Sequence, residues 1–331
     1  MTITSSEPRT KPVRVRRAAW LVFLWLLVLP GTAWALIRLG GWERGALVQL
    51  FAFTAYVAAW SVVPLIAALA TRRWLAAAVA AVTVGLFAVM VLPRALADGD
   101  RGPQNGVTLT VMTSNMLFGG ADATELVRLV RENDVAVLAV QEFTPAGRDS
   151  LKAAGLGPLL PYSSLGPEFG ASGSGLYSRF PITDPGVRQN GGGFHQAYGT
   201  IQPPGAGPVI VESAHPLAPF SLEALEGWRD DLEAEPHADP NGLPRILLGD
   251  FNSTLDHAPL RTLIESGYRD AADAAGEGLI GTWGPYDGDP LPPVTIDHVL
   301  ADRRLGIGDV SVHHVPDSDH RAVIAALHVP S

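Results

Sequence analysis

Residues 245–254 read Arg-Ile-Leu-Leu-Gly-Asp-Phe-Asn-Ser-Thr, a short apolar run followed by a glycine, an aspartate and an asparagine. The run has the length and flanks of a buried strand, so Asp250 and Asn252 are predicted to lie where that strand ends. Polar residues at such a point belong either to a solvated turn or to a site. Sites favour strand ends, because the scaffold fixes side chains there while the loops leave room for substrate.

Similar polar endings recur along residues 107–329. Ser114-Asn115 closes the run 107–114, Gln141-Glu142 follows 135–140, His215 follows 208–214, Asp297-His298 lies within 294–300, and Ser318-Asp319-His320 opens 321–329. Taken singly, each is explained by a surface turn or a cap. Taken together and in order, they indicate one shared site.

Short apolar runs alternate with amphipathic segments throughout this region. Further strands are predicted at 173–180, 245–249 and 309–315, and helices near 122–132, 220–234 and 258–266. The alternation predicts one layered α/β domain with a substantial core. The segments 183–207 and 268–293 are rich in Gly and Pro and are predicted to be substrate loops.

Three long apolar runs precede the domain. They cover residues 18–37, 46–70 and 74–92. Each is near or above the roughly 18–20 residues that a helix needs to cross a bilayer. Residues 18–92 are therefore predicted to form three transmembrane helices.

Basic residues predict the orientation of these helices. They cluster in the N-terminal segment 1–17 and at Arg72-Arg73, which are expected to stay in the cytoplasm. The domain at 107–331 then lies outside the cell, after a turn-rich linker at 93–106. In an alternative interpretation, Ala33-Trp34-Ala35 is a signal-peptidase site and the first run is removed, which still exports the domain.

Composition limits the chemistry. The chain has no cysteine, so a metal would have to be bound by oxygen and imidazole ligands.

The charge differs between the two parts of the chain. Residues 1–100 carry ten Lys/Arg and four Asp/Glu, a net charge of +6. Residues 101–331 carry fourteen Lys/Arg and twenty-nine Asp/Glu, a net charge of −15. A sequence-independent nucleic-acid binder presents a basic groove, so nucleic acid is disfavoured as the partner of the acidic domain.

The polar endings form a recognisable series. It reads Ser-Asn (114–115), Gln-Glu (141–142), Ser-Arg-Phe-Pro-Ile (178–182), His215, Gly-Asp-Phe-Asn (249–252), Thr-Trp (282–283), Ile-Asp-His (296–298) and Ser-Asp-His (318–320). This series resembles the endonuclease/exonuclease/phosphatase superfamily, which has the deoxyribonuclease-like fold. The resemblance implies that residues 107–331 form a two-sheet α/β sandwich. The three predicted transmembrane helices precede it in the sequence. Two departures, Ala322 where many relatives have proline and Pro216 where many have leucine, remove no functional group.

The resemblance implies a hydrolase of phosphate esters that depends on Mg²⁺, with Mn²⁺ as the alternative. By position, Glu142, Asn115 and Asp319 resemble the metal-holding residues of the family. Asp250 and Asn252 resemble its water-orienting and transition-state groups. His320 resembles the phosphate-binding histidine, which Asp297 holds in place, and His215 resembles the second histidine. The chemistry agrees, because Mg²⁺ prefers oxygen ligands and imidazoles can stabilise charge on phosphoryl oxygens.

Three hypotheses for function remain. The architecture resembles the membrane-anchored bacterial subgroup that includes VanJ, which implies a lipid-linked phosphate substrate such as undecaprenyl pyrophosphate at the outer membrane face. The second hypothesis is a membrane-anchored extracellular nuclease. The third, a non-catalytic envelope-binding module, predicts loss of at least one of Glu142, Asp250, Asn252 or His320. The other histidines are predicted to be surface or core residues, and His257 lies closest in sequence to the Asp250 loop.

Overall fold

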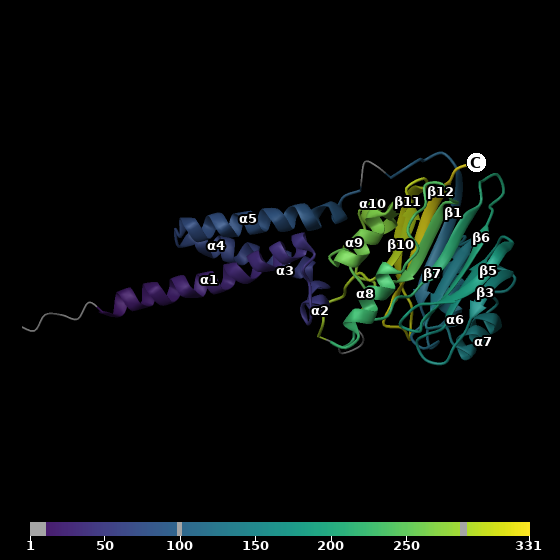
Figure 1. Ribbon diagram of the computed structural model, residues 1–331, viewed down its shortest axis with the longest axis horizontal. Coiled ribbons are helices and arrows are strands. Elements are labelled where there is room, and N and C mark those ends of the chain that lie inside the picture. Colours follow the sequence, from purple (N-terminus) through teal and green to yellow (C-terminus); the bar gives the residue numbers. More distant parts are fainter. Residues whose placement is uncertain (1–10, 98–100, 285–289) are drawn as a thin grey trace, which may run out of the picture. The chain divides into compact units, whose positions relative to one another are not determined.

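A computed structural model describes residues 11–97, 101–284 and 290–331 (Figure 1). The chain forms two compact units. The helical unit comprises Met1–Trp42 and Thr54–Leu92, and the sandwich unit comprises Glu43–Phe53 and Pro93–Ser331. Most of the predicted basic N-terminus and small parts of the predicted linker and second loop lie outside the described residues.

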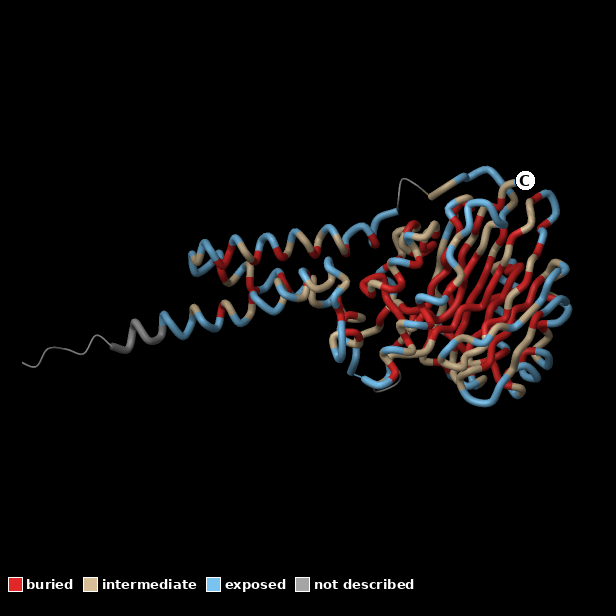
Figure 2. The backbone as a smooth tube through the Cα atoms, in the orientation of Figure 1, coloured by how far each residue is buried: buried red, intermediate tan, exposed pale blue. Residues whose placement is uncertain are grey.

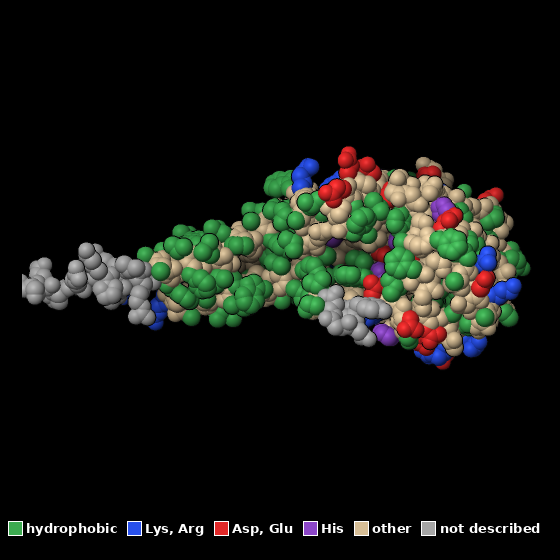
Figure 3. All heavy atoms as spheres, turned by 90° about the horizontal axis from the view of Figure 1, so that it is seen from below, with side chains coloured by type: hydrophobic (Ala, Val, Ile, Leu, Met, Phe, Trp, Pro, Cys, Tyr) green, Lys and Arg blue, Asp and Glu red, His purple; other side chains and the backbone are tan. Residues whose placement is uncertain are grey.

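The helical unit has an apolar surface. Its helices are α1 (Lys11–Gly40), α3 (Thr54–Trp60), α4 (Val62–Ala70) and α5 (Trp74–Val91). Residues such as Leu26, Leu75 and Val89 are exposed, and Figure 3 shows hydrophobic side chains covering these helices. Two segments, Arg17–Gly40 and Trp74–Ala95, are long and apolar enough to cross a membrane. Exposed apolar surface of this extent is costly in water and is what a bilayer would cover.

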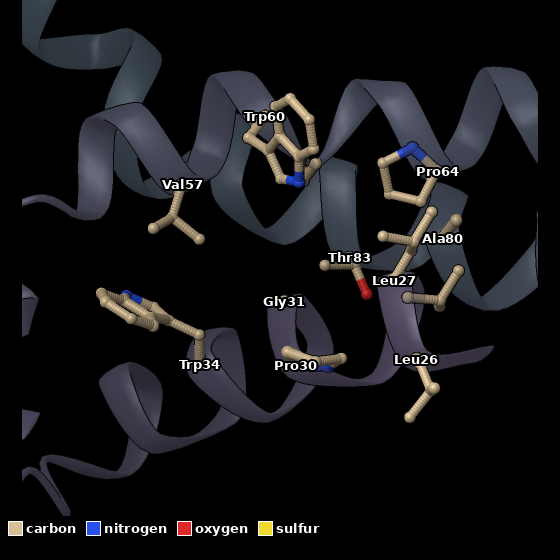
Figure 4. Close-up of a pocket in the computed structure, with 12 residues that line it drawn as sticks. Leu26, Leu27, Pro30, Gly31, Trp34, Val57, Trp60, Pro64, Ala80 and Thr83 are labelled. Carbon is tan, nitrogen blue, oxygen red and sulfur yellow. The ribbon is translucent and has the colours of Figure 1, made fainter. Parts of the chain in front are cut away.

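The helices of this unit also enclose a small apolar cavity of about 250 Å³. Trp34 and Trp60 line it, together with Thr83 from α5 (Figure 4). The hydroxyls of Thr32 and Thr83 lie 2.8 Å apart, so α1 and α5 are joined by a hydrogen bond beside the cavity.

The predicted count of three membrane spans is not confirmed, because the run 46–70 is not one continuous helix. Its first part forms α2 (Leu47–Phe51), which belongs to the sandwich unit. The remainder is the shorter apolar helix Thr54–Ala70, interrupted at Ser61. Pro64 accounts for the interruption, because its ring clashes with the carbonyl four residues earlier and it has no N–H to donate.

The sandwich unit contains two six-stranded mixed sheets (Figure 1). The first has the order β11-β12-β1-β2-β4-β3 and the second β5-β6-β7-β8-β10-β9. The strands are β1 (Val107–Asn115), β2 (Val137–Gln141), β3 (Tyr162–Gly166), β4 (Ser174–Ser178), β5 (Ile182–Gln189), β6 (His195–Ile201), β7 (Val209–Ala214), β8 (Arg245–Asp250), β9 (Tyr268–Asp270), β10 (Asp297–Asp302), β11 (Gly306–His314) and β12 (Arg321–Val329).

The core lies between the sheets and beneath the helices. Side chains such as Val111, Val211 and Leu248 fill the space between the sheets, where Figure 2 shows the buried residues concentrated along the strands. Helix α6 (Ala123–Glu132) packs with α7 (Pro145–Ala153) outside the first sheet, and α8 (Leu225–Glu233) with α9 (Ala258–Glu265) outside the second. The short helix α10 (Ala271–Ala275) follows β9, and a 3₁₀ turn (Leu92–Ala95) spans the boundary at which the chain enters the sandwich unit from α5.

The prediction of loops at 183–207 and 268–293 is wrong for much of the first segment and for the beginning of the second. The first holds most of β5 and all of β6, and the second holds β9 and α10. Strand β5 contains Pro185 and Gly186, and its pairing with β6 shifts register between Thr183 and Gly186. Proline and a bulge are tolerated at the edge of a sheet, so a sequence typical of a turn forms an edge strand here.

Candidate active site

The topology brings the polar strand endings to one edge of the sandwich. The pairs β1–β2 and β7–β8 are parallel, so within each pair the carboxyl ends lie side by side. Strands β12 and β10 run antiparallel to β1 and β8, so each begins where its partner ends. Asp297, the first residue of β10, is directly opposite Asp250, the last residue of β8.

Asp250 lies at the centre of this cluster. Its Oδ2 atom accepts a hydrogen bond from Asn115 Nδ2 at 3.0 Å and lies 3.8 Å from His215 Nε2 and 3.6 Å from His320 Nε2. Its Oδ1 atom accepts the backbone N–H of Asn252 at 2.8 Å, which fixes the carboxylate. Burial raises the pKa of Asp250, whereas the nearby His320 charge lowers it. Asp250 can therefore hold a water molecule or accept its proton.

His320 is paired with Asp297. The Nδ1 atom lies 2.9 Å and 3.1 Å from the two Asp297 carboxylate oxygens, so Nδ1 carries a proton and donates it. Burial lowers the pKa of His320, but the charges of Asp297 and Asp250 and the hydrogen bond to Asp297 outweigh burial and raise the pKa to about 10. The imidazolium is suited to binding a phosphoryl oxygen.

His215 differs from His320 in charge. Burial lowers its pKa to about 4, with His320 adding to the effect and Asp250 opposing it. Its ring packs edge-on against Phe194, with centroids 4.7 Å apart, and its Nδ1 atom has no hydrogen-bond partner among the described residues. The site therefore places a neutral and a protonated imidazole beside the same Asp250 oxygen, Oδ2, in two environments suited to different roles.

Glu142 and Asn115 form a second pair beside Asp250. Asn115 Nδ2 lies 3.2 Å from Glu142 Oε1, and the N–H of Phe118 donates to Glu142 Oε2 at 2.8 Å. Glu142, Phe118 and Asn252 all have positive φ, at 51°, 54° and 49°. Such conformations are strained for residues other than glycine and collect at functional sites.

The carboxylates here fit a divalent cation. Burial raises the pKa of Glu142, as expected for an anion without a matching positive charge. The Oδ1 atom of Asp319 is buried without a hydrogen-bond partner in the described part of the chain, although it lies 4.0 Å from His320 Nε2. An oxygen ligand set of this kind suits Mg²⁺ or Mn²⁺.

A different trio also meets the distance requirement for a metal. Ligand atoms of Asp250, Asp297 and His320 all lie within 4.8 Å of one another. Both Asp297 oxygens already face a protonated imidazole, however, and an imidazolium cannot ligate a metal through the nitrogen that carries its proton. Asp319 Oδ1 has no hydrogen-bond partner among the described residues, and the Glu142 oxygens accept hydrogen bonds only from neutral amide groups, so these two carboxylates are better placed to receive a cation.

Several supporting residues were not assigned roles from the sequence. Trp283 Nε1 donates to Asp319 Oδ2 at 2.9 Å, and Ser318 Oγ donates to the Asn115 carbonyl at 3.0 Å. Thr282 Oγ1 accepts the N–H of Asp297 at 2.9 Å. Thr-Trp belongs to the motif series, but only the fold shows that these side chains hold the polar cluster in place.

Two further buried histidines, His298 and His257, have structural partners. His298 contacts Asp270 Oδ2 at 2.7 Å and the Ser253 carbonyl at 2.9 Å. His257 accepts the N–H of Thr254 and lies 2.8 Å from the carbonyl of Val48. A non-catalytic module is expected to lack at least one of four residues. All four are present at the site, namely Glu142, Asp250, Asn252 and His320.

Two facing sheets with an acid, amide and imidazole cluster at one edge define a hydrolase of phosphate esters. The sequence model of the Endonuclease/Exonuclease/phosphatase family matches residues 112–320, and the chain belongs to that family. Enzymes of this family depend on divalent metal ions. The comparison with curated protein sequences gives no match.

Solved structures share the fold at low sequence identity. An endonuclease/exonuclease/phosphatase from Beutenbergia cavernae DSM 12333 is 20% identical, with a TM-score of 0.52 over 68% of this chain and 72% of that one. Sphingomyelinase C from Streptomyces griseocarneus is 16% identical, with a TM-score of 0.51 over 66% and 99%. D. rerio TDP2 complexed with a single-strand DNA product is 14% identical, with a TM-score of 0.51 over 67% and 99%.

Proposed function

We propose that the chain hydrolyses the phosphate ester or pyrophosphate of a lipid-linked substrate at the outer face of a membrane, with Mg²⁺ or Mn²⁺ bound. The observation that carries the chemistry is the approach of a neutral His215 and a protonated His320 to the same Asp250 oxygen, at 3.8 Å and 3.6 Å. The observation that favours a lipid is the presence of two apolar helices long enough to cross a membrane.

The side chains divide the work of hydrolysis. Glu142 and Asp319, with Asn115 beside them, would hold the cation, which supplies positive charge to the phosphoryl oxygens. Asp250 orients a water molecule and accepts its proton as the water oxygen attacks phosphorus. The bond from phosphorus to the oxygen of the leaving group breaks as the new bond forms, and that oxygen departs with the bonding electrons and takes a proton from solvent. His320, fixed by Asp297, donates a hydrogen bond to the phosphoryl oxygen where negative charge increases. Asn252 and His215 complete the polar surface around the attacked group.

An anchored nuclease is the second candidate, since a nucleic-acid phosphodiester presents the same reacting group. Charge argues against it. Residues 101–331 carry a net charge of −15, and such a field repels a polyanion over about a Debye length, roughly 8 Å at physiological salt. A single lipid phosphate carries far less charge and would reach the site by lateral diffusion.

The test compares kcat/KM for a polyprenyl pyrophosphate in mixed micelles with kcat/KM for duplex DNA, using full-length protein. The full chain is needed because a fragment of residues 104–331 would lack Glu43–Phe53, which belongs to the sandwich unit. We expect the lipid to be the better substrate, with both activities lost on chelation. Equal or better efficiency on DNA would leave the anchored nuclease as the function.

Orientation is tested separately. A reporter active only outside the cytoplasm, fused after Ser331, should be active. If only a cytoplasmic reporter is active at that position, the proposed location at the outer face is wrong.

A further inference from the structure

The segment Glu43–Phe53 packs as part of the sandwich unit although it lies between two apolar helices in the sequence. Val48 is buried with Trp228 and Leu260, in the cluster that covers the second sheet. Helix α2 is short, so its position depends on these tertiary contacts more than on its own helical stability.

Hydrogen bonds fix the segment at its first residue and near its middle. Glu43 Oε1 accepts the N–H of Ala258 near the start of α9. Gln49 Nε2 donates to the carbonyl of Pro219 at 2.7 Å. These bonds join the segment to α9 and to the loop that follows His215.

His257 provides a third attachment and is a positioning residue. Its Nδ1 atom accepts the N–H of Thr254 at 2.9 Å, so Nε2 carries the proton and donates to the Val48 carbonyl at 2.8 Å. The ring therefore connects α2 to the loop that follows Asp250.

The segment also borders a cavity of about 710 Å³ that opens onto the catalytic cluster. This volume is within the range of about 300–1,000 Å³ usual for small-molecule sites. Six of the residues that line it are the polar groups Glu142, His215, Asp250, Asn252, Asp319 and His320. The segment contributes Val48, Gln49, Ala52 and Phe53 to the lining, of which three are apolar.

Other apolar side chains line the same cavity. Phe220, in the loop joined to Gln49, is 72% exposed, and Phe118, whose N–H donates to Glu142, is 58% exposed. Exposed apolar side chains that gather at one cavity are typical of a ligand-binding groove. A ligand that satisfies both parts of the cavity has a phosphate at one end and a hydrocarbon chain at the other.

We propose that Glu43–Phe53 forms one wall of the substrate site and that this wall, with Phe220, binds the hydrocarbon chain of a phosphate-bearing lipid. The inference rests on the proposed function and names the residues that recognise the lipid part of the substrate. The segment is joined in sequence to α1 before it and α3 after it, and α1 contains one of the two segments long and apolar enough to cross a membrane.

The test measures binding of water-soluble n-alkyl phosphonates with two to eight carbons to full-length protein in Mg²⁺, by titration calorimetry. Phosphonates are not hydrolysed, so binding is measured independently of turnover. Each methylene that enters the cavity should tighten binding up to about fourfold. We expect Phe53→Ser and Phe220→Ser to flatten this dependence on chain length while leaving the two-carbon phosphonate bound as in wild type.

Matched controls come from the same segments. Leu50 on α2 and Leu222 near Phe220 are both exposed and do not line the cavity. Leu50→Ser and Leu222→Ser should keep the wild-type dependence on chain length. The proposed wall is wrong if the affinity of the wild-type protein does not depend on chain length. It is also wrong if all four substitutions change that dependence equally. If the wild-type protein shows no ester hydrolysis that a chelator inhibits, the proposed function is wrong. A failure of the wall and a failure of the proposed function therefore give different results.

Discussion

Replacing Asp297 by asparagine removes the negative charge beside His320 and keeps the size of the side chain. In the wild-type site, His320 Nδ1 faces both Asp297 oxygens, at 2.9 Å and 3.1 Å. A hydrogen bond between charged groups contributes about 1.5–3 kcal/mol, against about 1 kcal/mol for a neutral one. The substitution should therefore remove about 1–2 kcal/mol of transition-state stabilisation, or about 5- to 30-fold in kcat/KM.

The pH profile gives a second measurement with a definite sign. Asp297 helps to raise the pKa of His320 to about 10, so its neutralisation lowers that pKa. If the protonated imidazole binds the phosphoryl group, activity in Asp297→Asn falls at a lower pH than in wild type. The assay is hydrolysis of a soluble chromogenic phosphate ester, with kcat/KM measured from pH 6 to pH 10.

The matched control is Asp302→Asn at the other end of the same strand. Asp302 is buried and paired with Arg304, about 17 Å along β10 from Asp297. This change should leave the pH profile unaltered. Wild-type kcat/KM and an unmoved alkaline limb in Asp297→Asn would refute the role of the Asp297–His320 pair.

Three further predictions concern turnover, metal and stability. Asp250→Ala should lower turnover by about 10²–10⁴-fold while the protein stays folded, and wild-type rates would exclude Asp250 as the water-orienting group. Chelation should abolish activity. Glu142→Gln should raise the metal concentration that gives half-maximal rate by at least about tenfold. If this concentration is unchanged, Glu142 does not bind the metal. Arg94 forms a buried ion pair with Asp256 at 2.7 Å. Arg94→Met should therefore lower the free energy of unfolding, measured with denaturant, by about 3–5 kcal/mol. The double variant Arg94→Met with Asp256→Leu should recover most of that loss. A cost below about 1 kcal/mol for the single change would contradict the burial argument.

The sequence alone determined most of the strand pattern and the identity of the polar cluster. Eight strand predictions have counterparts in the structure, and the polar residues that end them meet at one edge. These predictions succeed because a buried strand requires a local run of apolar residues, and because the Gly-Asp-Phe-Asn and Ser-Asp-His patterns are specific. Strands β3, β5, β6 and β9 were missed, since their burial depends on neighbours distant in sequence rather than on their own composition.

Only the tertiary structure decided where the segment Glu43–Phe53 belongs. Hydropathy assigned residues 46–70 to a single membrane helix, because an apolar side chain suits a bilayer and a protein core equally well. The fold distinguishes the two by contacts that no local pattern encodes, such as the bond from His257 to the Val48 carbonyl. The charges of His215 and His320 are likewise a property of the fold, since identical side chains acquire opposite protonation from burial and from the placement of Asp297.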